Sequence, residues 1–375
     1  MKKGLVVEKS NVKGLGTIFY YFGHSATAEN VGERGVSHLA EHLLCKSFDH
    51  LLSTITTYSV SYNAFTSDDH VCFYWSGLDD KLTELEPEFK KLFNFVPTKE
   101  QFELEKSIII QEYTGWFAGQ SAIYANINRK YYDYYGPIGC RQDIESISYE
   151  HFLEFYKRFS SPTIIYRVTG NKKSEIKELY KGIKFSNPVK LKKKKASKLV
   201  IEETSSFPNS VTLIDWVDVS KFEKHEIEFV SSMFSNGLES PLYKEIRENR
   251  GLVYGLGTYT EDFGDVNKFE FVAQCVPENV AEVRSVANEI LTNPEKYLTR
   301  ERFESIKMSS VNNEKLKNIQ NQGTGSILNK IIYGKDYFEK IQNLTFERVM
   351  EVANLLKVEL ETNVKHASLG ETQEI

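Results

Sequence analysis

Residues 38–42 read His38-Leu-Ala-Glu-His42, and this stretch is the most informative part of the chain. On an α-helix, His38, Glu41 and His42 lie at positions i, i+3 and i+4, so their side chains project from one face. Two imidazoles one turn apart can hold a divalent metal ion, and the carboxylate between them can reach a water on that metal. The alternative is a helix whose histidines merely lie on a polar surface. Because the chain has only 8 histidines, this spacing favours a metal site.

A further ligand is needed, because a catalytic zinc ion takes three protein ligands and leaves one position to water. The stretch from Glu105 to Glu112 offers two carboxylates that are two helical turns apart and therefore share a face. Solvated helices often carry such pairs, so the pair alone is a weak signal. It follows His42 by about seventy residues, as does the partner segment of enzymes with a reversed His-Glu-x-x-His motif.

The chain resembles the pitrilysin/insulinase family of zinc peptidases (inverzincins), which includes the mitochondrial processing peptidases and small bacterial two-domain members. The likeness follows the family's order along nearly the whole chain. It is carried by the segments Gly23–Glu29, His38–His42, Asn63–Ser67 with Val71–Trp75, and Arg247–Tyr254. One departure is Lys46-Ser-Phe, where the family has Lys-Gly-Thr.

This resemblance implies a zinc site with assigned roles. One zinc ion per chain would have His38, His42 and Glu112 as ligands, and Glu41 would act as general base. Glu105 would orient a ligand histidine through its other ring nitrogen. The alternative for Glu105 is a carboxylate that faces solvent.

The resemblance also implies catalytic roles for two residues of the second half. Tyr254 would donate its phenol to the oxyanion of the tetrahedral intermediate, and Arg247 would bind a substrate carbonyl. Without the resemblance, Tyr254 would be interpreted as an ordinary aromatic residue of a strand and Arg247 as an ordinary charged residue on the surface. Because Gly251 lies between them, helical spacing does not predict that they meet.

The resemblance also implies a substrate strand. Asn63, Ala64 and Phe65 would pair with an extended peptide by strand addition, in which backbone hydrogen bonds tolerate varied sequences. An ordinary turn residue is the alternative for Asn63.

Composition restricts the class of protein. The 41% hydrophobic and 13% aromatic content supports filled cores, and the net charge of −5 argues against a nucleic-acid binder. The basic run Lys190–Lys195 fits a solvated linker better than a polyanion site. The 4 cysteines are far apart, as expected for free thiols in a reducing compartment, and no stretch is long and apolar enough to span a membrane. We therefore expect a cytoplasmic protein without membrane contact.

A weak internal repeat predicts two homologous domains. Tyr135-Gly136 and the stretch Ile144–Glu150 recur as Tyr333-Gly334 and Ile341–Glu347, and in each copy a Ser148 or Thr345 is placed to cap a helix. We predict an α+β fold of two α/β-sandwich domains with antiparallel-rich sheets, each with helices packed on one face. The predicted parts are a zinc-binding domain (1–187), a linker (188–198) and a C-terminal domain without metal (199–375). At the offset of the metal motif the second half has Met233–Gly237, which offers no ligand.

Local patterns predict several elements. Strands are expected at Leu15–Phe22 and Val71–Trp75, and a hairpin from Leu252–Thr260 and Lys268–Val276 around Phe263-Gly-Asp265. Ser240 resembles an N-cap followed by Pro241 at the first helical position, and Gly251 resembles the C′ residue that closes this helix. The valines from Val280 and the later Ile290 form a helical stripe.

The sequence therefore predicts a zinc metalloendopeptidase that cleaves peptides, leader segments or unfolded segments. One alternative is a catalytically silent peptidase-like subunit that acts in binding or assembly, although the intact ligand set speaks against it. Another is a metal hydrolase that does not cleave peptides. Larger family members enclose substrate between four homologous domains, so we expect a homodimer or a heterodimer with a related subunit.

Overall fold

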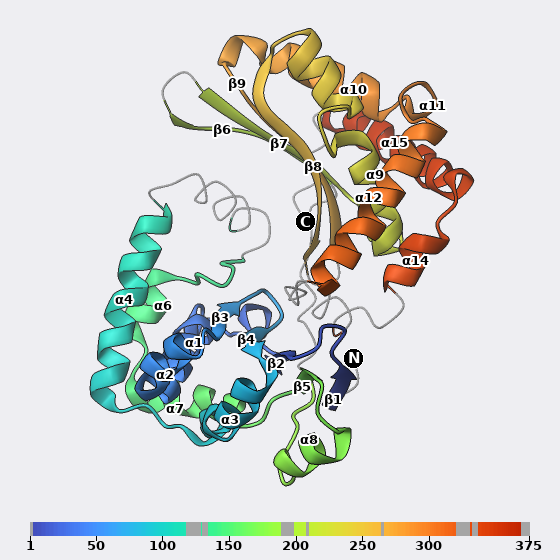
Figure 1. Cartoon of the computed structure of the whole chain (residues 1–375). Coiled ribbons are helices and arrows are strands. Elements are labelled where there is room, and N and C mark those ends of the chain that lie inside the picture. Colours follow the sequence, from blue (N-terminus) through green and yellow to red (C-terminus); the bar gives the residue numbers. More distant parts are fainter. Residues whose placement is uncertain are drawn as a thin grey trace. The chain divides into compact units, whose positions relative to one another are not determined.

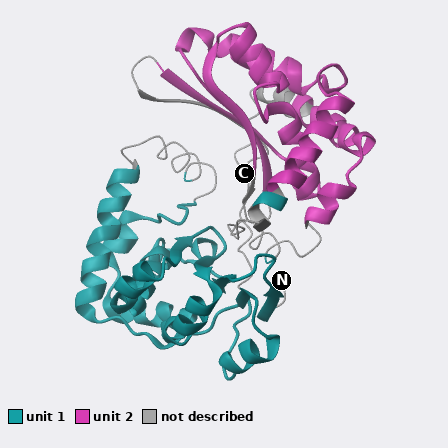
Figure 2. Cartoon of the chain, in the orientation of Figure 1, with its two compact units in different colours: residues 1–192, 314–334 teal, residues 193–313, 335–375 magenta. Residues whose placement is uncertain are grey.

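The computed structural model describes residues 3–117, 129, 134–188, 199–207, 210–263, 266–319, 331 and 337–368. Contacts divide the chain into two compact units (Figure 2). Unit 1 comprises residues 1–192 and 314–334, and unit 2 comprises residues 193–313 and 335–375. The predicted domain ranges stay a prediction, and the predicted linker lies outside the described residues except for Pro188. The predicted mixed α/β architecture is confirmed, because each unit has a sheet with helices packed against it.

Unit 1 is built on a sheet whose strand order, within the described residues, is β1-β5-β2-β4-β3 (Figure 1). β5 pairs in parallel with β1, and the other pairs are antiparallel. The predicted strands at Leu15–Phe22 and Val71–Trp75 are confirmed as β2 and β4. The strands are β1 (Gly4–Lys9), β2 (Leu15–Phe22), β3 (Ser61–Thr66), β4 (Val71–Leu78) and β5 (Ile164–Thr169).

Unit 1 also contains α-helices and short 3-10 helices. The α-helices are α1 (Val36–Cys45), α2 (Leu52–Thr57), α3 (Asp79–Phe89), α4 (Lys99–Phe117), α6 (Arg141–Ser146), α7 (Tyr149–Tyr156) and α8 (Lys173–Leu179). Short 3-10 helices are η1 (Ala26–Ala28), η2 (Lys46–Leu51), η3 (Lys90–Asn94) and η4 (Lys157–Ser160).

Strand β2 is buried on both faces, because successive side chains of a strand point to opposite sides. Ile18, Tyr20 and Phe22 join the main core, which also contains Leu39 and Leu43 of α1. The intervening Phe19 and Tyr21 belong to a second cluster on the other face, with Cys72, Ile164, Tyr166 and Ile331. The metal-motif helix therefore packs on one defined face of the sheet.

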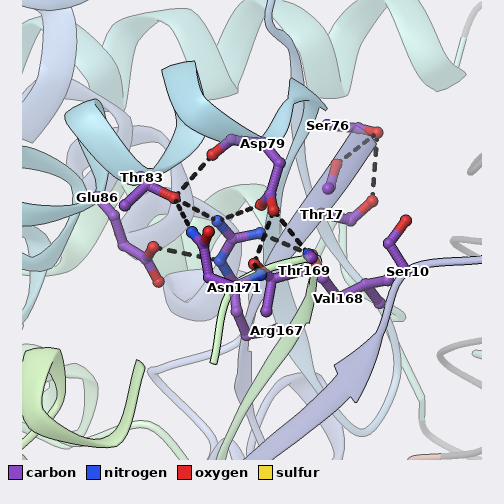
Figure 3. Close-up of polar contacts among 12 residues, drawn as sticks. Ser10, Thr17, Ser76, Asp79, Thr83, Glu86, Arg167, Val168, Thr169 and Asn171 are labelled. Carbon is purple, nitrogen blue, oxygen red and sulfur yellow. Dashed lines mark hydrogen bonds and ion pairs between the residues drawn. The ribbon is translucent and has the colours of Figure 1, made fainter. Parts of the chain in front are cut away.

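An ion-pair network inside unit 1 ties α3 to β5 (Figure 3). Arg167 is fully buried, with Nη2 2.8 Å from Asp79 Oδ1 and Nε 3.2 Å from Glu86 Oε2. Asp79 Oδ2 also accepts hydrogen bonds from Thr169 Oγ1 (2.8 Å) and the Gly170 amide (2.7 Å). Burial raises the pKa of Glu86. The guanidinium of Arg167 is therefore the positive charge that pairs with both buried carboxylates.

Arg167→Met is expected to lower the free energy of unfolding by about 3–5 kcal/mol, because it leaves buried carboxylates without their cation. The matched control is Arg141→Met, which removes an exposed Arg141–Glu145 pair (2.7 Å) and should cost at most about 1 kcal/mol. Urea unfolding of both variants measures the difference. Equal losses would contradict the structural role given to Arg167.

Unit 2 has a sheet with strand order β6-β7-β9-β8 in the part of the chain that the structure describes. All its pairs are antiparallel. The predicted hairpin is confirmed as β8 and β9, while residues 264–265 of its turn lie outside the described residues. The strands are β6 (Leu199–Phe207), β7 (Ser210–Asp218), β8 (Val253–Phe263) and β9 (Val266–Cys275).

Helices pack against this second sheet through a core of their own. The predicted helical stripe from Val280 to Ile290 is confirmed as part of α10. The helices are α9 (Lys224–Ser235), α10 (Val280–Leu291), α11 (Pro294–Tyr297), α12 (Arg300–Ile319), α14 (Tyr337–Asn343) and α15 (Phe346–Ser368), with the π-helix η5 (Tyr243–Asn249) and the 3-10 helix η6 (Pro277–Asn279).

The helix before β8 departs in part from the prediction. Gly251 follows η5 with φ of 62°, the left-handed conformation expected of a residue that ends a helix. Ser240 takes the predicted N-cap position, because its carbonyl accepts from the Lys244 amide at 2.9 Å and Pro241 is the first helical residue. Its buried hydroxyl, however, has no hydrogen-bond partner among the described residues and does not cap the helix. The turns around Arg247 are π-helical, a geometry that occurs often at functional sites.

Equivalent hydrogen bonds recur in the two halves. Ser148 Oγ accepts from the His151 amide and Thr345 Oγ1 from the Arg348 amide, each at 3.2 Å, so both predicted caps are confirmed. Just before each cap, a lysine of a long helix donates to a backbone carbonyl: Lys106 to Ile147 (3.0 Å) and Lys307 to Leu344 (2.8 Å). This agreement supports the proposed duplication. The repeated Tyr333-Gly334 lies outside the described residues.

Within the described residues, Cys45, Cys72, Cys140 and Cys275 form no disulfide. No helix there combines the length and apolar character needed to cross a membrane.

Candidate metal centre

Helices α1 and α4 carry the side chains of the predicted site. His38, Glu41 and His42 lie on α1, whereas Glu105 and Glu112 lie on α4. The regular turns of both helices produce the predicted shared faces. Residues that are about seventy positions apart in the sequence come together because α1 and α4 lie against each other, with His42 in contact with both Glu105 and Glu112.

Three donors converge on one point. Glu112 Oε2 lies 3.7 Å from Nε2 of His38 and 3.7 Å from Nε2 of His42. Among the described residues, these three form the one group of His, Cys, Asp or Glu side chains placed to hold a metal, with ligand atoms within 4.8 Å of one another. In a tetrahedral zinc site, bonds of about 2.0–2.2 Å place ligand atoms about 3.3–3.6 Å apart. The two Glu112–histidine distances of 3.7 Å lie just above this range, so zinc would draw the three donors inward.

The protonation state of His38 also suits a metal ligand. Burial, followed by the charge of His42, lowers the pKa of His38 to about 3. The imidazole is therefore neutral near pH 7, the form that binds metal. Its Nδ1 is buried without a hydrogen-bond partner among the described residues.

Glu105 lies behind His42. Its Oε2 is 3.1 Å from Nδ1 of His42, and its Oε1 is 2.9 Å from Nζ of Lys46. It is only 3% exposed, which rules out a carboxylate facing solvent. Because Nδ1 of His42 is engaged, Nε2 is the nitrogen left for a metal. Lys46 was not predicted to belong to the site, although it lies four residues after His42.

Glu41 points to the end of β3. Its Oε2 accepts a hydrogen bond of 2.7 Å from Oγ1 of Thr66, the last residue of that strand. Burial raises the pKa of Glu41, and the Thr66 hydroxyl opposes this rise. Sequence reasoning missed Thr66, although it directly follows the predicted substrate strand Asn63-Ala64-Phe65.

Strand β3 forms one edge of the sheet within the described residues. Asn63 lies inside this strand, so the alternative of a turn residue is wrong. Its Oδ1 accepts from the Ala64 amide at 3.0 Å. Ala64 packs on the core that contains α1, whereas Phe65 contacts His70 and the cluster on the opposite face. Of the three predicted substrate residues, Ala64 thus lies on the metal-helix side, as Thr66 does.

In unit 2 the structure brings Arg247 and Tyr254 together. The Arg247 guanidinium lies 5.3 Å from the centre of the Tyr254 ring and 4.9 Å from that of Tyr243. Tyr254 is 81% exposed at a bulge between Val253 and Gly255. The two predicted catalytic residues form a cation–π pair with an accessible phenol. That they act on the residues of unit 1 stays a prediction.

The second half carries no equivalent of the metal motif at the predicted position. Met233 is fully buried in the core of unit 2 at the end of α9. Phe234 is fully buried as well, whereas Asn236 and Gly237 are exposed.

Comparisons with known proteins agree with this architecture. A family model described as the peptidase M16 inactive domain matches residues 146–310. An uncharacterized zinc protease of Rickettsia bellii is 23% identical over 272 residues, which cover 65% of this chain and 64% of that protein, slightly under two thirds of its length. An uncharacterized zinc protease of Bacillus subtilis is 19% identical over 95% of this chain and 93% of its own.

Among solved structures, a protease from Helicobacter pylori has the same fold, with a TM-score of 0.76 and 17% identity over 94% of both chains. The stretch matched by the inactive-domain model begins after Glu112. It therefore does not include the three converging donors or Glu41.

Proposed function

We propose, from the premise that this chain is an M16 peptidase-like protein of the pitrilysin family, that it is a zinc-dependent endopeptidase. The observation that carries the proposal is the convergence of His38, His42 and Glu112 beside the buried Glu41. Peptides, leader segments or unfolded segments are the proposed substrates.

Metal and base have separate roles in this proposal. Zinc held by the three donors would supply a Lewis acid that lowers the pKa of a water molecule to about 7. Glu41 would remove the proton of the attacking water and later deliver it to the leaving amine. Thr66 would hold the Glu41 carboxylate in one orientation through its 2.7 Å hydrogen bond. Glu105, itself bound by Lys46, would fix the ring of His42.

The edge of β3, which has no further strand partner within the described residues, would bind the peptide. An extended segment added there gains main-chain hydrogen bonds, and Thr66 at the end of the strand would bring the peptide close to Glu41. The Ala64 amide already has a partner in Oδ1 of Asn63, so we expect that bond to open when a peptide binds.

The first test is cleavage of a quenched-fluorescence peptide library by the purified chain, before and after chelation and after zinc is restored. The proposal expects cleavage that is lost with the chelator and returns with zinc. Zinc binding without turnover would favour a silent peptidase-like subunit. Turnover of esters or simple amides without peptide cleavage would favour another metal hydrolase.

Tyr254→Phe is expected to lower kcat by about 10²–10³-fold with little change in KM, if the phenol donates only to the oxyanion. The matched control is Tyr259→Phe, a second exposed tyrosine of β8. Steady-state kinetics on one library peptide separates the outcomes. A change in KM alone would restrict Tyr254 to substrate binding.

A dimer is expected, of two identical chains or with a related subunit, because larger members of the family enclose substrate between four homologous domains and the two predicted domains here would correspond to half of these. Light scattering should give twice the mass of one chain for a homodimer. Folded proteins should be cleaved much more slowly than short peptides. An active monomer that digests both equally fast would contradict this proposal.

A further inference from the structure

The segment Ser25–Glu29, which contains η1, has no role in the chemistry proposed above, yet its polar side chains are buried. Ser25 is 0% exposed, and Thr27 and Glu29 are below one tenth. Burying polar groups is unfavourable unless they form hydrogen bonds. Each of these three side chains does so, and the partners belong to two different elements.

One end of the segment holds the hairpin loop that follows β3. Ser25 Oγ donates to the Ser67 carbonyl at 2.6 Å. Thr27 donates to the Asp68 carbonyl through both its amide and its Oγ1, each at 2.9 Å. Ser67 directly follows Thr66, so these bonds fix the backbone next to the hydroxyl that contacts Glu41.

The other end holds the start of the metal-motif helix. Glu29 Oε2 accepts from the Gly35 amide and Oε1 from the Ser37 amide, each at 2.7 Å. Ser37 is adjacent to His38. The Glu29 carboxylate therefore binds donors at the first turn of α1 that have no partner within the helix.

No side chain at the start of α1 could replace Glu29. The N-cap residue is Gly35, whose φ of 99° disfavours any other residue. A Cβ there would lie 2.8 Å from Ile144 Cδ1 and 3.1 Å from Gly139 Cα. The serine, threonine or aspartate that usually caps a helix is thus excluded by sterics, and Glu29 supplies the cap from six residues upstream.

We propose that Ser25, Thr27 and Glu29 are positioning residues, which form a bracket that holds the start of α1 and the end of β3 in register so that Thr66 meets Glu41. This inference rests on the proposed function for its effect on catalysis. The bracket itself follows from the five hydrogen bonds. It gives a role to the Gly23–Glu29 segment, which the proposed function left without one.

Glu29 provides the first arm of the test, carried out well above pH 7 because burial raises the pKa of Glu29 to about 7. Glu29→Ala should weaken zinc binding by about 10- to 100-fold, as loss of groups that orient metal ligands does. Glu29→Gln, which keeps one acceptor oxygen, should lose less. Chelator competition measures the affinity, and hydrogen exchange should be faster across Gly35–His42. The control is Glu33→Gln, whose carboxylate binds Asn30 and His151 instead of α1.

Ser25 provides the second arm. Ser25→Ala should leave zinc affinity unchanged, speed hydrogen exchange across the β3–β4 hairpin and lower kcat. In a Thr66→Val background, Ser25→Ala should lower kcat no further, because both changes act through the Thr66–Glu41 bond. In a Thr66→Ser background, which keeps the hydroxyl, Ser25→Ala should again lower kcat.

Several results would overturn the bracket. Wild-type zinc affinity and wild-type exchange in Glu29→Ala would do so, as would full additivity of Ser25→Ala and Thr66→Val. If Glu29→Ala does not fold, an unchanged zinc affinity in Glu29→Gln would overturn the bracket as well. A wild-type chain that binds no zinc would contradict the proposed function, and hydrogen exchange would still decide whether the bracket exists.

Discussion

Glu41→Gln is expected to keep one zinc ion per chain and to lower kcat for peptide cleavage by about 10²–10⁴-fold, the contribution of a general base. Glu41 is not one of the three converging donors, so its loss should leave metal binding intact. Glutamine has nearly the same shape, and its amide oxygen still accepts from Thr66. The variant therefore removes the base and little else.

Metal analysis and single-turnover kinetics of the same preparation test this expectation. Glu145→Gln, an exposed glutamate of α6, controls for the loss of one negative charge. If Glu41→Gln retains most of its turnover, another residue is the base. If it loses zinc, Glu41 belongs to the metal ligands.

Glu112→Gln is expected to lose metal and activity together. The change replaces an anionic ligand by a neutral amide, a poor ligand for zinc. Glu112 is exposed, and its Oε2 lies 3.7 Å from Nε2 of both histidines. Among the described residues, no other carboxylate belongs to the donor group. We expect zinc affinity to fall by more than about 100-fold, beyond the usual effect of residues that only orient ligands.

The matched control for Glu112→Gln is Glu103→Gln, an exposed glutamate on the same helix α4. It should bind zinc like the wild type. Full zinc occupancy in Glu112→Gln at low free metal would remove Glu112 from the ligand set.

Local features, which depend on residues close together in the chain, were predictable from the sequence. A high content of aromatic and β-branched residues indicated β2 and β4, and helical spacing put His38 and His42 on one face and Glu105 and Glu112 on another. The resemblance supplied what spacing could not, namely that the two faces meet. Such a meeting depends on tertiary packing, which a single sequence does not encode in any local pattern.

Contacts between distant segments were missed for the same reason. Thr66 reaches Glu41 across 25 residues, and no periodicity relates the two. The cap of α1 comes from Glu29 because Gly35 cannot carry one, whereas the local rule placed a cap at Ser240, whose hydroxyl makes no such bond. The Arg247–Tyr254 contact follows from the left-handed Gly251, which turns the chain from η5 into β8.

The central claim is that His38, His42 and Glu112 bind one catalytic zinc ion. Elemental analysis of the purified and dialysed chain, beside a His38→Ala/His42→Ala variant, tests it most directly. We predict one zinc per wild-type chain and none in the double variant, with peptide cleavage following the zinc content. A wild-type chain that holds no zinc, or a double variant that still holds it, would contradict the claim.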